Sequence, residues 1–507
     1  MTYLLGINIG TTRIQAALFN ELGRVINIAE YECTLNITNT NYVEVDINDY
    51  WLACVKAIRA ILNASKIKPS NIAAIAVSSH GETLVPVDKE GKPLRKAIVW
   101  LDKRSLKECR LIRKEFEADL IFKATGQPDV IPVWPATKIL WIKNNEKKIF
   151  EKTNKFLFVE DYINYKLSGS FITEYSISSS SLLFDIQKEQ WWLEMLKFLG
   201  LDENQLSELK PSGSYIGNIT YEASKETGLN IKTEVATGAF NQAAAAIGAG
   251  GIKPGMITER TEDALAIVAP IEKPIYDPMR KIPCHHHAIN KAYFLLPWSS
   301  TAGIALRWFR DEFLKPEKDV ANAINMNPYK LLELEAERAP AGSYGLIFLP
   351  YLMGAECPEF DPSAKGVMFG ITLRHTKAHF IRAIMESVAY MLRRNIELLE
   401  GLGIKVDKII SIGKGAENPL WMQIKSDVIN KVILSPRFKS TAPLGAAILA
   451  SVAAKKFNTI EEACKSMVLI KDSFIPNPKN RKVYDKLYKI YLNLYDNLKG
   501  LFPLVTI

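Results

Sequence analysis

The sequence predicts an α/β protein built from two related halves that flank a cleft. Segments with strand and helix patterns alternate along the whole chain, which favours mixed sheets covered by helices. A Gly/Pro-rich joint at residues 248–255 divides the chain near its middle. Each half carries a glycine turn directly after a strand, at residues 10–12 and 413–415. These observations predict two domains, residues 1–249 and 250–507.

The first half opens with an apolar strand that ends at Ile9, the turn Gly10-Thr11-Thr12 and a second apolar strand. Apolar runs and helical periodicity then predict two strands, at residues 72–79 and 96–102, and two helices, at residues 106–122 and 135–152.

The second half repeats this scheme. We expect strands at residues 257–270 (a strand pair), 284–290, 291–298 and 407–413, and helices at residues 301–313, 419–430 and 480–498. In the last helix, residues one turn apart form an apolar stripe: Val483, Leu487, Tyr491 and Tyr495. Such a stripe is typical of a packing face, so we do not expect these tyrosines to form a cofactor site.

Composition restricts the class of protein. A chain of 507 residues exceeds one compact core, and 48% hydrophobic and 23% charged residues are ordinary for a globular protein. The first residues lack a basic leader, and the small-apolar run at residues 444–454 is too short to span a bilayer. We therefore expect a cytoplasmic protein without a membrane partner.

The six cysteines and the net charge of +9 indicate no additional function. The cysteines are scattered without a Cys-x-x-Cys pair, so neither a disulfide framework nor a zinc ribbon is predicted. The lysines are spread along the chain without interleaved aromatic residues, so we expect solvated helix faces and no nucleic-acid partner.

The turn at residues 10–12 has the chemistry of a phosphate cradle, because a tight Gly-Thr-Thr bend offers free backbone N–H groups and two hydroxyls. A phosphate-transfer site at this turn needs a carboxylate beside it to manage a magnesium ion. The side chain in that place is the uncharged amide of Asn8.

Seven motifs in order along nearly the whole chain resemble the FGGY carbohydrate kinases, which include glycerol kinase and xylulokinase. They begin at Gly6 (GINIGTT), Ser78 (SSHGETLVPVDKEGKPL, followed by IVWLDKR), Thr237 (TGAFNQAAAAIGAG), Leu346 (LIFLPYLMG), Asp361 (DPSAKGVMFGITLRHT) and Pro443 (PLGAAILA). The resemblance implies two actin-like, ribonuclease-H-like domains. It also implies transfer of the γ-phosphoryl of ATP to a sugar or polyol hydroxyl, with sugar bound mainly by the first domain and ATP by the second.

The resemblance also assigns the two catalytic positions. An aspartate at the place of Asn8 helps to position magnesium and the phosphates, and an aspartate at the place of Asn241 accepts the proton of the attacking hydroxyl. Both residues are asparagine in this chain. An amide neither accepts a proton nor carries a charge that attracts a cation at neutral pH. We therefore predict impaired catalysis and question the magnesium requirement.

On the nucleotide side, the resemblance implies contacts from both glycine turns and from the strand pair. The implied residues are Gly10, Thr11, Thr12, Arg13, Arg260, Thr261, Gly413, Lys414, Gly415 and Asn418. In the family pattern, Arg260 replaces a glycine, Thr261 is retained, and Glu262 places an anion where an anionic ligand would come. Glu262 or Asp263 could instead take over a metal, and Arg260 or Lys414 could pair with phosphate.

On the sugar side, the resemblance implies contacts from His80, Glu82, Asp102, Trp134, Asn241 and Gln242. Glu82 is expected to contact the sugar, although a loop cap explains it equally well. His80 could bond a sugar hydroxyl or simply pack. Asp102 is expected at the pocket rim, and Trp134 is expected to form a stacking wall in preference to a core position.

The run Cys284-His285-His286-His287 has the residue types of a metal cluster. On a strand, His285 and His287 share one face while His286 points away. No fourth ligand is evident, and a structural zinc site needs four, so we expect no metal here.

Two functions of different classes therefore remain. The first is an ATP-dependent kinase of a small ketose or polyol, impaired by its two asparagines. The second is a catalytically silent pseudokinase that binds sugar or nucleotide, or regulates a partner protein. A structural subunit of a kinase complex is a weaker third option, and the sequence leaves a homodimer open.

Overall fold

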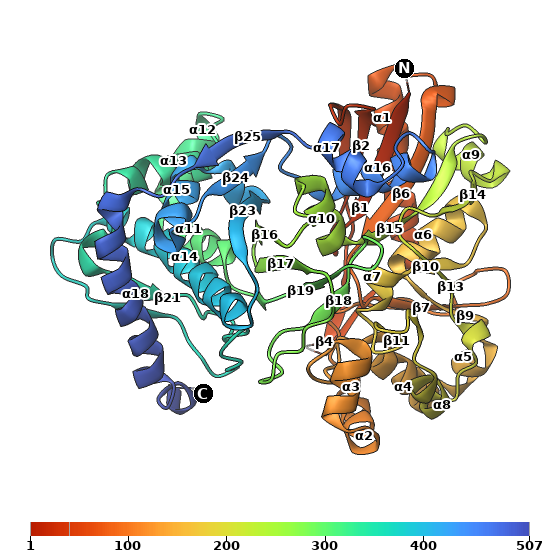
Figure 1. The fold of residues 1–507 in the computed structure, drawn as a ribbon, viewed down its shortest axis with the longest axis horizontal. Helices are drawn as coiled ribbons and strands as arrows, with labels where there is room; N and C mark the ends of the chain where they lie inside the picture. Colours follow the sequence, from red (N-terminus) through yellow and green to blue (C-terminus); the bar gives the residue numbers. More distant parts are fainter. Residues whose placement is uncertain (1, 40, 506–507) are drawn as a thin grey trace. The chain divides into compact units, whose positions relative to one another are not determined.

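The computed structural model describes residues 2–39 and 41–505, which fold into two compact units (Figure 1). Unit 1 contains the chain up to Ile252 together with Pro270–Leu295 and Ser440–Leu469. Unit 2 contains Lys253–Ala269, Leu296–Lys439 and the chain from Ile470 onward. The expected single division after residue 249 is therefore corrected, because two later segments return to unit 1.

A six-stranded sheet forms the centre of unit 1, in the order β14-β15-β6-β1-β2-β3. Its parallel part consists of β15 (Glu234–Phe240), β6 (Ile72–Ser79) and β1 (Tyr3–Ile9). The antiparallel strands are β2 (Arg13–Asn20) and β3 (Val25–Glu32) on one side and β14 (Tyr215–Asn218) on the other. The carboxyl ends of β1, β6 and β15 consequently meet at one edge.

Two helices cover one face of this sheet at unusually short range. They are α10 (Asn241–Ala249) and α16 (Thr441–Ala453), which pack against each other, and α16 also packs against β1 and β6 (Figure 1). A Cβ atom on Gly6 of β1 would lie 1.8 Å from the Pro443 carbonyl oxygen. A Cβ atom on Gly445 would lie 1.9 Å from the Ala244 carbonyl oxygen. Only glycine permits these backbone contacts.

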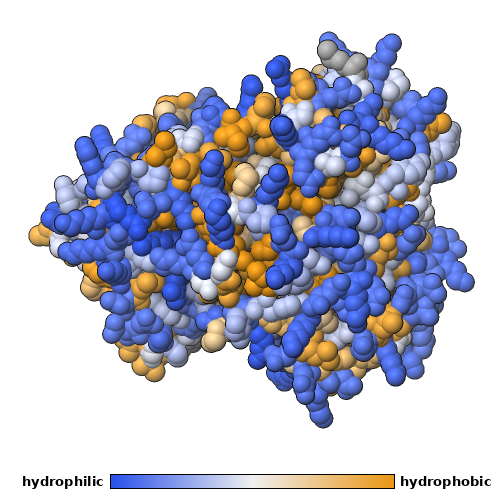
Figure 2. Space-filling model, viewed as in Figure 1, coloured by the Kyte–Doolittle hydropathy of each residue, from blue (hydrophilic) through white to orange (hydrophobic). Residues whose placement is uncertain are grey.

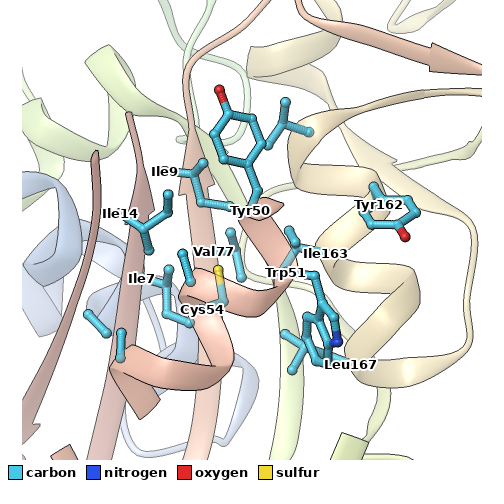
Figure 3. Close-up of a cluster of buried hydrophobic side chains, with 14 of the residues drawn as sticks. Ile7, Ile9, Ile14, Tyr50, Trp51, Cys54, Val77, Tyr162, Ile163 and Leu167 are labelled. Carbon is cyan, nitrogen blue, oxygen red and sulfur yellow. The ribbon is translucent and has the colours of Figure 1, made fainter. Parts of the chain in front are cut away.

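The opposite face of the sheet carries an apolar core of unit 1 (Figure 3). Helices α1 (Ile47–Ser65) and α6 (Val159–Ser168) pack on it. Figure 3 shows side chains of the sheet gathered against those of the two helices, namely Ile7, Ile9, Ile14, Val77, Tyr50, Trp51, Cys54, Tyr162, Ile163 and Leu167. Because strand side chains alternate between faces, Gly6 and Asn8 lie on the opposite face, which α16 covers.

The rest of unit 1 surrounds this centre. A five-stranded sheet contains β4 (Asn36–Asn39), β5 (Tyr42–Val45), β8 (Ala97–Ile98), β7 (Leu84–Val87) and β9 (Lys155–Phe158). Short strands are β10 (Ile172–Glu174), β11 (Phe184–Asp185), β12 (Gln190–Trp191), β13 (Glu208–Lys210), β18 (Cys284–His286) and β19 (Tyr293–Leu295). Further helices are α2 (Leu106–Glu115), α3 (Ala118–Thr125), α4 (Pro135–Asn145), α5 (Lys147–Lys152), α7 (Tyr175–Ser178), α8 (Leu193–Leu199), α9 (Tyr221–Thr227) and α17 (Ile460–Met467).

Two predicted helices are each divided, and one predicted strand is shorter than expected. The helix predicted at 106–122 breaks at Phe116, whose backbone is extended and whose ring packs on Trp192 and Phe198. The helix predicted at 135–152 breaks at Glu146, which pairs with Arg95 at 2.6 Å. The strand predicted at 96–102 is only β8. Tertiary contacts override the local helical pattern at both breaks.

Unit 2 repeats the central motif of unit 1, an antiparallel hairpin followed by a parallel strand. The hairpin is β16 (Gly255–Thr261) and β17 (Leu265–Ile271), and β23 (Val406–Ile412) pairs parallel with β16. The other strands are β20 (Trp298–Ser299), β24 (Ile433–Pro436), β25 (Ile470–Phe474), β21 (Ile347–Leu349) and β22 (Val367–Phe369). The helices are α11 (Gly303–Phe313), α12 (Lys315–Ala323), α13 (Pro328–Glu337), α14 (Lys377–Gly401), α15 (Pro419–Ile429) and α18 (Pro478–Leu498).

The predicted helices of the second half are confirmed, with one adjustment in α18, but the strands predicted at 284–290 and 291–298 are shorter than expected, since they are only β18 and β19. The fully buried side chains of α18 are Tyr484, Leu487, Tyr488 and Tyr491, whereas Val483 and Tyr495 are only partly buried. The tyrosines of this helix therefore pack, as the sequence predicts.

The surface and the cysteines add little that directs function. Within residues 2–39 and 41–505, no helix has the length and apolar character that a membrane crossing requires. The six cysteines are free and buried. Figure 2 shows hydrophilic side chains distributed across the whole visible face, interspersed with hydrophobic ones.

Substitution of Gly6 by alanine tests the close approach of α16 to β1. The new methyl group would collide with a backbone carbonyl that cannot rotate away, so we expect a loss of about 3 kcal/mol or more in the free energy of unfolding. Gly401→Ala at the end of α14 is the control, because nothing lies within 4 Å of its added Cβ. Chemical denaturation measures both; equal stability of the two variants would contradict the packing.

Candidate active site

Three polar residues, Asn8, Ser78 and Asn241, lie at the carboxyl ends of the parallel strands in unit 1. Asn8 on β1 is the register partner of Ser78 on β6, and Ser79 is the register partner of Phe240 at the end of β15. Asn241 follows Phe240 and begins α10. Neighbouring strands lie about 4.8 Å apart, so Asn8 and Asn241 lie on the order of 10 Å apart across β6. Ligands of open α/β sheets bind at such edges.

The Asn8 side chain is partly buried and held by one hydrogen bond. The Ser78 hydroxyl lies 3.1 Å from Asn8 Oδ1 and 3.2 Å from the Ile7 carbonyl oxygen, so it can donate to either. Among the described residues, no group accepts a hydrogen bond from the Asn8 amide nitrogen. This nitrogen is therefore a donor that a ligand can use.

The turn after β1 keeps the tight bend that the sequence predicts. The Gly10 N–H donates to the Arg13 carbonyl at 2.8 Å. The Thr11 hydroxyl accepts from the Trp100 indole at 2.8 Å and the Thr11 carbonyl from the Tyr50 hydroxyl at 2.7 Å, which anchor the bend. The Thr12 side chain is exposed, and Arg13 pairs with Glu30 at 3.2 Å. The exposed groups of this predicted nucleotide turn are thus Thr12 and Arg13.

Asn241 and Gln242 occupy the first two positions of α10 and are partly exposed. In the described part of the chain, neither side chain has a hydrogen-bond partner. The first turn of a helix also presents unpaired backbone N–H groups and the positive end of the helix dipole. Both amides are therefore available to a polar ligand.

Two buried carboxyl groups support the backbone that leads to Asn241, and a third, Asp161, accepts instead from the Ser207 hydroxyl. Glu160 Oε1 accepts from the Gly238 N–H at 2.9 Å. The Ser176 hydroxyl accepts from the Phe240 N–H at 2.9 Å and donates to Glu174 at 2.8 Å. Desolvation raises the pKa of Glu160 and Glu174 above their usual range and that of Asp161 to about 7. No motif in the sequence indicated this cluster.

The loop after β6 brings Glu82 to the same region. The Ser180 hydroxyl donates to Glu82 Oε1, and the Lys138 ammonium donates to the Glu82 carbonyl and, at 2.7 Å, to the Val133 carbonyl. His80 is buried, with Nδ1 3.2 Å from the Ile9 carbonyl and Nε2 2.8 Å from the Thr83 hydroxyl. Both His80 nitrogens are thus occupied, and this geometry favours packing over sugar contact.

Asp102 and Trp134 also use their polar groups inside the protein. Asp102 Oδ1 accepts from the Arg104 backbone N–H and Nε, while Oδ2 accepts from the Arg104 guanidinium and the Val43 N–H. Trp134 is 7% exposed, and its indole donates to the Asp129 carbonyl. The structure thus gives Asp102 the contacts of a loop anchor and buries most of Trp134, and the expected pocket rim and stacking wall stay predictions.

The bend between β16 and β17 in unit 2 differs from the expected alignment. Thr261 is the last residue of β16 and fully buried, and its hydroxyl donates to Glu259 at 2.8 Å and accepts from Lys425 at 2.7 Å. The bend itself consists of Glu262, Asp263 and Ala264. The expected phosphate contact from Thr261 is therefore corrected, because its hydroxyl is buried and bonded to Glu259 and Lys425.

Two carboxylates occupy this bend. Glu262 Oε1 lies 3.4 Å from the Lys414 backbone nitrogen and 3.9 Å from the Arg260 guanidinium. Asp263 pairs with Arg307 at 2.9 Å. An added Cβ on Gly413 would lie 3.0 Å from Glu262 Oε1, so the two turns face each other closely. The Glu262 carboxylate thus lies on an N–H group of the turn predicted to bind phosphate.

The other predicted nucleotide residues have distinct places. The Lys414 side chain is exposed, and Gly415 packs against Thr261, where a Cβ atom would lie 2.7 Å away. Asn418 caps α15 by accepting from the Trp421 N–H at 2.9 Å. This capping bond accounts for Asn418 without a ligand.

The three consecutive histidines alternate as a strand requires. His285 stacks on Phe294 and His287 makes an edge contact with the same ring, while His286 contacts Tyr175 and Glu189 from the other face. The predicted sharing of a face is confirmed. Among the described residues, no three His, Cys, Asp or Glu side chains are grouped to hold a metal ion.

Comparison with known proteins assigns the family. The model of the FGGY family of carbohydrate kinases matches residues 3–248 with its N-terminal domain and residues 275–454 with its C-terminal domain. The chain therefore belongs to the FGGY family of carbohydrate kinases. The resemblance predicted from the motifs is confirmed, as is the sugar kinase fold.

Relatives named as sugar kinases match nearly the whole chain. A xylulose kinase of Staphylococcus epidermidis is 30% identical over 500 residues, 98% of this chain and 97% of its own length. A gluconokinase of Bacillus subtilis is 30% identical over 495 residues, 97% of this chain and 95% of its own length. The crystal structure of a ligand-bound xylulose kinase from Lactobacillus acidophilus matches with a TM-score of 0.89 over 100% of both chains, at 24% identity.

Glu160→Gln tests the buried carboxyl cluster through its pH dependence. Because the pKa of Glu160 is raised in the folded protein, the folded state holds a proton that the unfolded state releases above about pH 4.5, and stability falls as pH rises. The glutamine removes this dependence while its amide oxygen keeps the bond to Gly238. We expect the melting temperature of the variant to gain on that of the wild type from pH 5 to pH 8.

The control is Glu151→Gln, whose exposed carboxylate pairs with Lys147 at 3.8 Å. It should melt with the wild type at both pH values. A constant difference between Glu160→Gln and the wild type across this range would exclude a buried protonated Glu160.

Glu262→Gln tests the occupied turn of unit 2. Removing this charge from the Lys414 N–H should strengthen binding of ADP, because an anion no longer competes there. The pair is partly exposed, so we expect a gain of about two- to fivefold. Calorimetry measures the affinity, with Asp263→Asn as the matched loss of charge in the same bend. Unchanged or weaker binding by Glu262→Gln would contradict the occupied turn.

Proposed function

We propose that this protein binds a small ketose or polyol in unit 1 and transfers the γ-phosphoryl group of ATP to one of its hydroxyls slowly. One observation carries the proposal. Amides stand at Asn8 and Asn241, the positions that the family resemblance assigns to carboxylates, while the surrounding frame of strand ends, Ser78 and α10 is intact.

The chemistry explains why the reaction is slow. Phosphoryl transfer depends on positioning and on neutralising charge, and the proton of the attacking hydroxyl must have an acceptor. Loss of a general base alone costs roughly a hundred- to ten-thousand-fold in rate. Asn241 cannot accept the proton, although its amide can still hold a sugar hydroxyl by hydrogen bonds.

The donor set around Asn8 does not suit a magnesium ion. The Asn8 oxygen lies within hydrogen-bond distance of the Ser78 hydroxyl, and an amide carries no charge to attract a hard cation. A magnesium ion would therefore arrive with the nucleotide phosphates. The amide nitrogen of Asn8 and the Thr12 and Arg13 groups can instead donate directly to phosphate oxygens.

The names of the relatives indicate which substrates to test first. Proteins named xylulose kinase and gluconokinase are about equally similar to this chain, so xylulose and gluconate are the first members of any substrate panel. A catalytically silent protein that binds sugar or nucleotide, alone or as a regulatory partner subunit, is the rival function. It differs only in having no turnover.

ADP release over a panel of ketoses, alditols and sugar acids tests the proposal. We expect sugar-dependent turnover well below the kinase range of about 1–100 per second. Asn8→Asp combined with Asn241→Asp should raise the rate at least about tenfold but not fully, because Glu262 still occupies the glycine turn of unit 2. Asn493→Asp, an exposed amide on α18, is the control and should change nothing.

Two results would contradict the proposal. Wild-type turnover of several per second would show that the amides do not impair catalysis. Measurable sugar binding without any turnover, in the wild type and in the double variant, would support the silent binding protein instead.

A further inference from the structure

The Glu82 carboxyl group lies in the same cluster of loops as Asn241. A Cβ atom on Gly81 would lie 3.2 Å from the Phe240 ring and 3.3 Å from the Ser180 hydroxyl. That hydroxyl donates to Glu82 Oε1, and Phe240 immediately precedes Asn241. The loop that carries Glu82 thus packs directly against the residue that precedes α10.

The backbone of Glu82 is held in an unfavourable conformation. Its φ is 63°, in the left-handed region that a side chain with a Cβ atom seldom adopts. The buried ammonium of Lys138 fixes this conformation by donating to the Glu82 and Val133 carbonyls. Strain that the surroundings impose in this way is concentrated at functional sites. Here the strained backbone sets the direction of the Glu82 side chain, and the Ser180 hydroxyl holds its carboxyl group by a hydrogen bond.

The charges around Glu82 suit a proton acceptor. Desolvation raises the pKa of Glu82 to about 7, against the opposing effects of the Ser180 hydrogen bond and the Lys138 ammonium. Lys138 is the charged group that faces Glu82, and desolvation lowers its own pKa to about 7, so the two groups titrate in the same range. His80 and His285 are neutral, because burial lowers their pKa values to about 4 and about 3. A base is most effective when its pKa lies near the working pH.

We propose that Glu82 accepts the proton of the attacking sugar hydroxyl in place of the missing carboxylate at Asn241. This step rests on the proposed kinase function. The hydroxyl oxygen forms a bond to the γ-phosphorus of ATP, and its proton passes to the Glu82 carboxylate. The bond between the γ-phosphorus and the bridging oxygen breaks, and ADP leaves with that electron pair. Glu82 then releases its proton to water.

A role in sugar binding alone makes a different prediction from a role as base. A residue that only holds the sugar remains necessary when a better base is supplied nearby. A base becomes dispensable in that case. Asn241→Asp supplies such a base, so the cost of Glu82→Gln in each background separates the two roles.

The experiment measures sugar-dependent ADP release from pH 6 to 9 by four proteins: wild type, Glu82→Gln, Asn241→Asp and the double variant. We expect Glu82→Gln to lower the wild-type rate about a hundredfold or more, and to lower the rate of Asn241→Asp less than about threefold. The wild-type rate should rise with pH around a midpoint near 7, because the carboxylate must be free of its proton.

Ser180→Ala gives a second readout that a merely structural role would not produce. The Ser180 hydrogen bond favours the charged form of Glu82, so its loss should move the midpoint of the pH profile upward. An unmoved midpoint would overturn the assignment of this midpoint to Glu82.

Calorimetric sugar titrations keep the two proposals distinguishable. An equal cost of Glu82→Gln in both backgrounds, or turnover only in the proteins that carry Asn241→Asp, would overturn the Glu82 step and leave the sugar-binding part of the proposed function intact. Absence of sugar binding and turnover in all four proteins would overturn both.

Discussion

The architecture of unit 1 depends on backbone contacts that only glycine allows. Gly6 lets β1 approach the start of α16, and Gly248 and Gly445 let α10 and α16 approach each other until hypothetical Cβ atoms would lie about 2 Å from carbonyl oxygens. Because these helices lie so close, the first residues of α10 are fixed relative to the carboxyl ends of β1 and β6. The position of Asn241 is therefore a consequence of packing.

This packing accommodates an amide or a carboxylate at residues 8 and 241 equally well. Asn8 and Asn241 lie at the rim of the packed region and contribute little to it, so exchanging a carboxylate for an amide leaves the core unchanged. The buried acids behind the site are a different case. Glu160 and Glu174 hold the backbone of residues 176–177 and 238 through hydrogen bonds, and their loss would move the site itself.

Motifs in the sequence predict the family and both hairpins, and they identify the positions of the two amides within the family pattern. Each of these features depends on a few adjacent residues. The motifs do not predict the alignment of the second bend. Thr261 matches a family motif, yet the hairpin closes one residue later, since Lys425 and Glu259 bind the threonine inside. Asp102 is similar: its motif is retained, but its partners Arg104 and Val43 become evident only in the fold. Contacts between distant segments are what local patterns omit.

In the proposed nucleotide site, Asn8 would meet phosphate as a neutral donor where a carboxylate would need a metal ion. The most direct test is calorimetric titration of ADP into the wild type and Asn8→Asp, with magnesium and then with a chelator. A unit charge at about 4 Å contributes on the order of 4 kcal/mol at an effective dielectric constant of about 20, enough to change ion dependence. We expect similar wild-type affinity under both conditions and a magnesium requirement only in Asn8→Asp. Collapse of wild-type affinity in the chelator would contradict this role of Asn8.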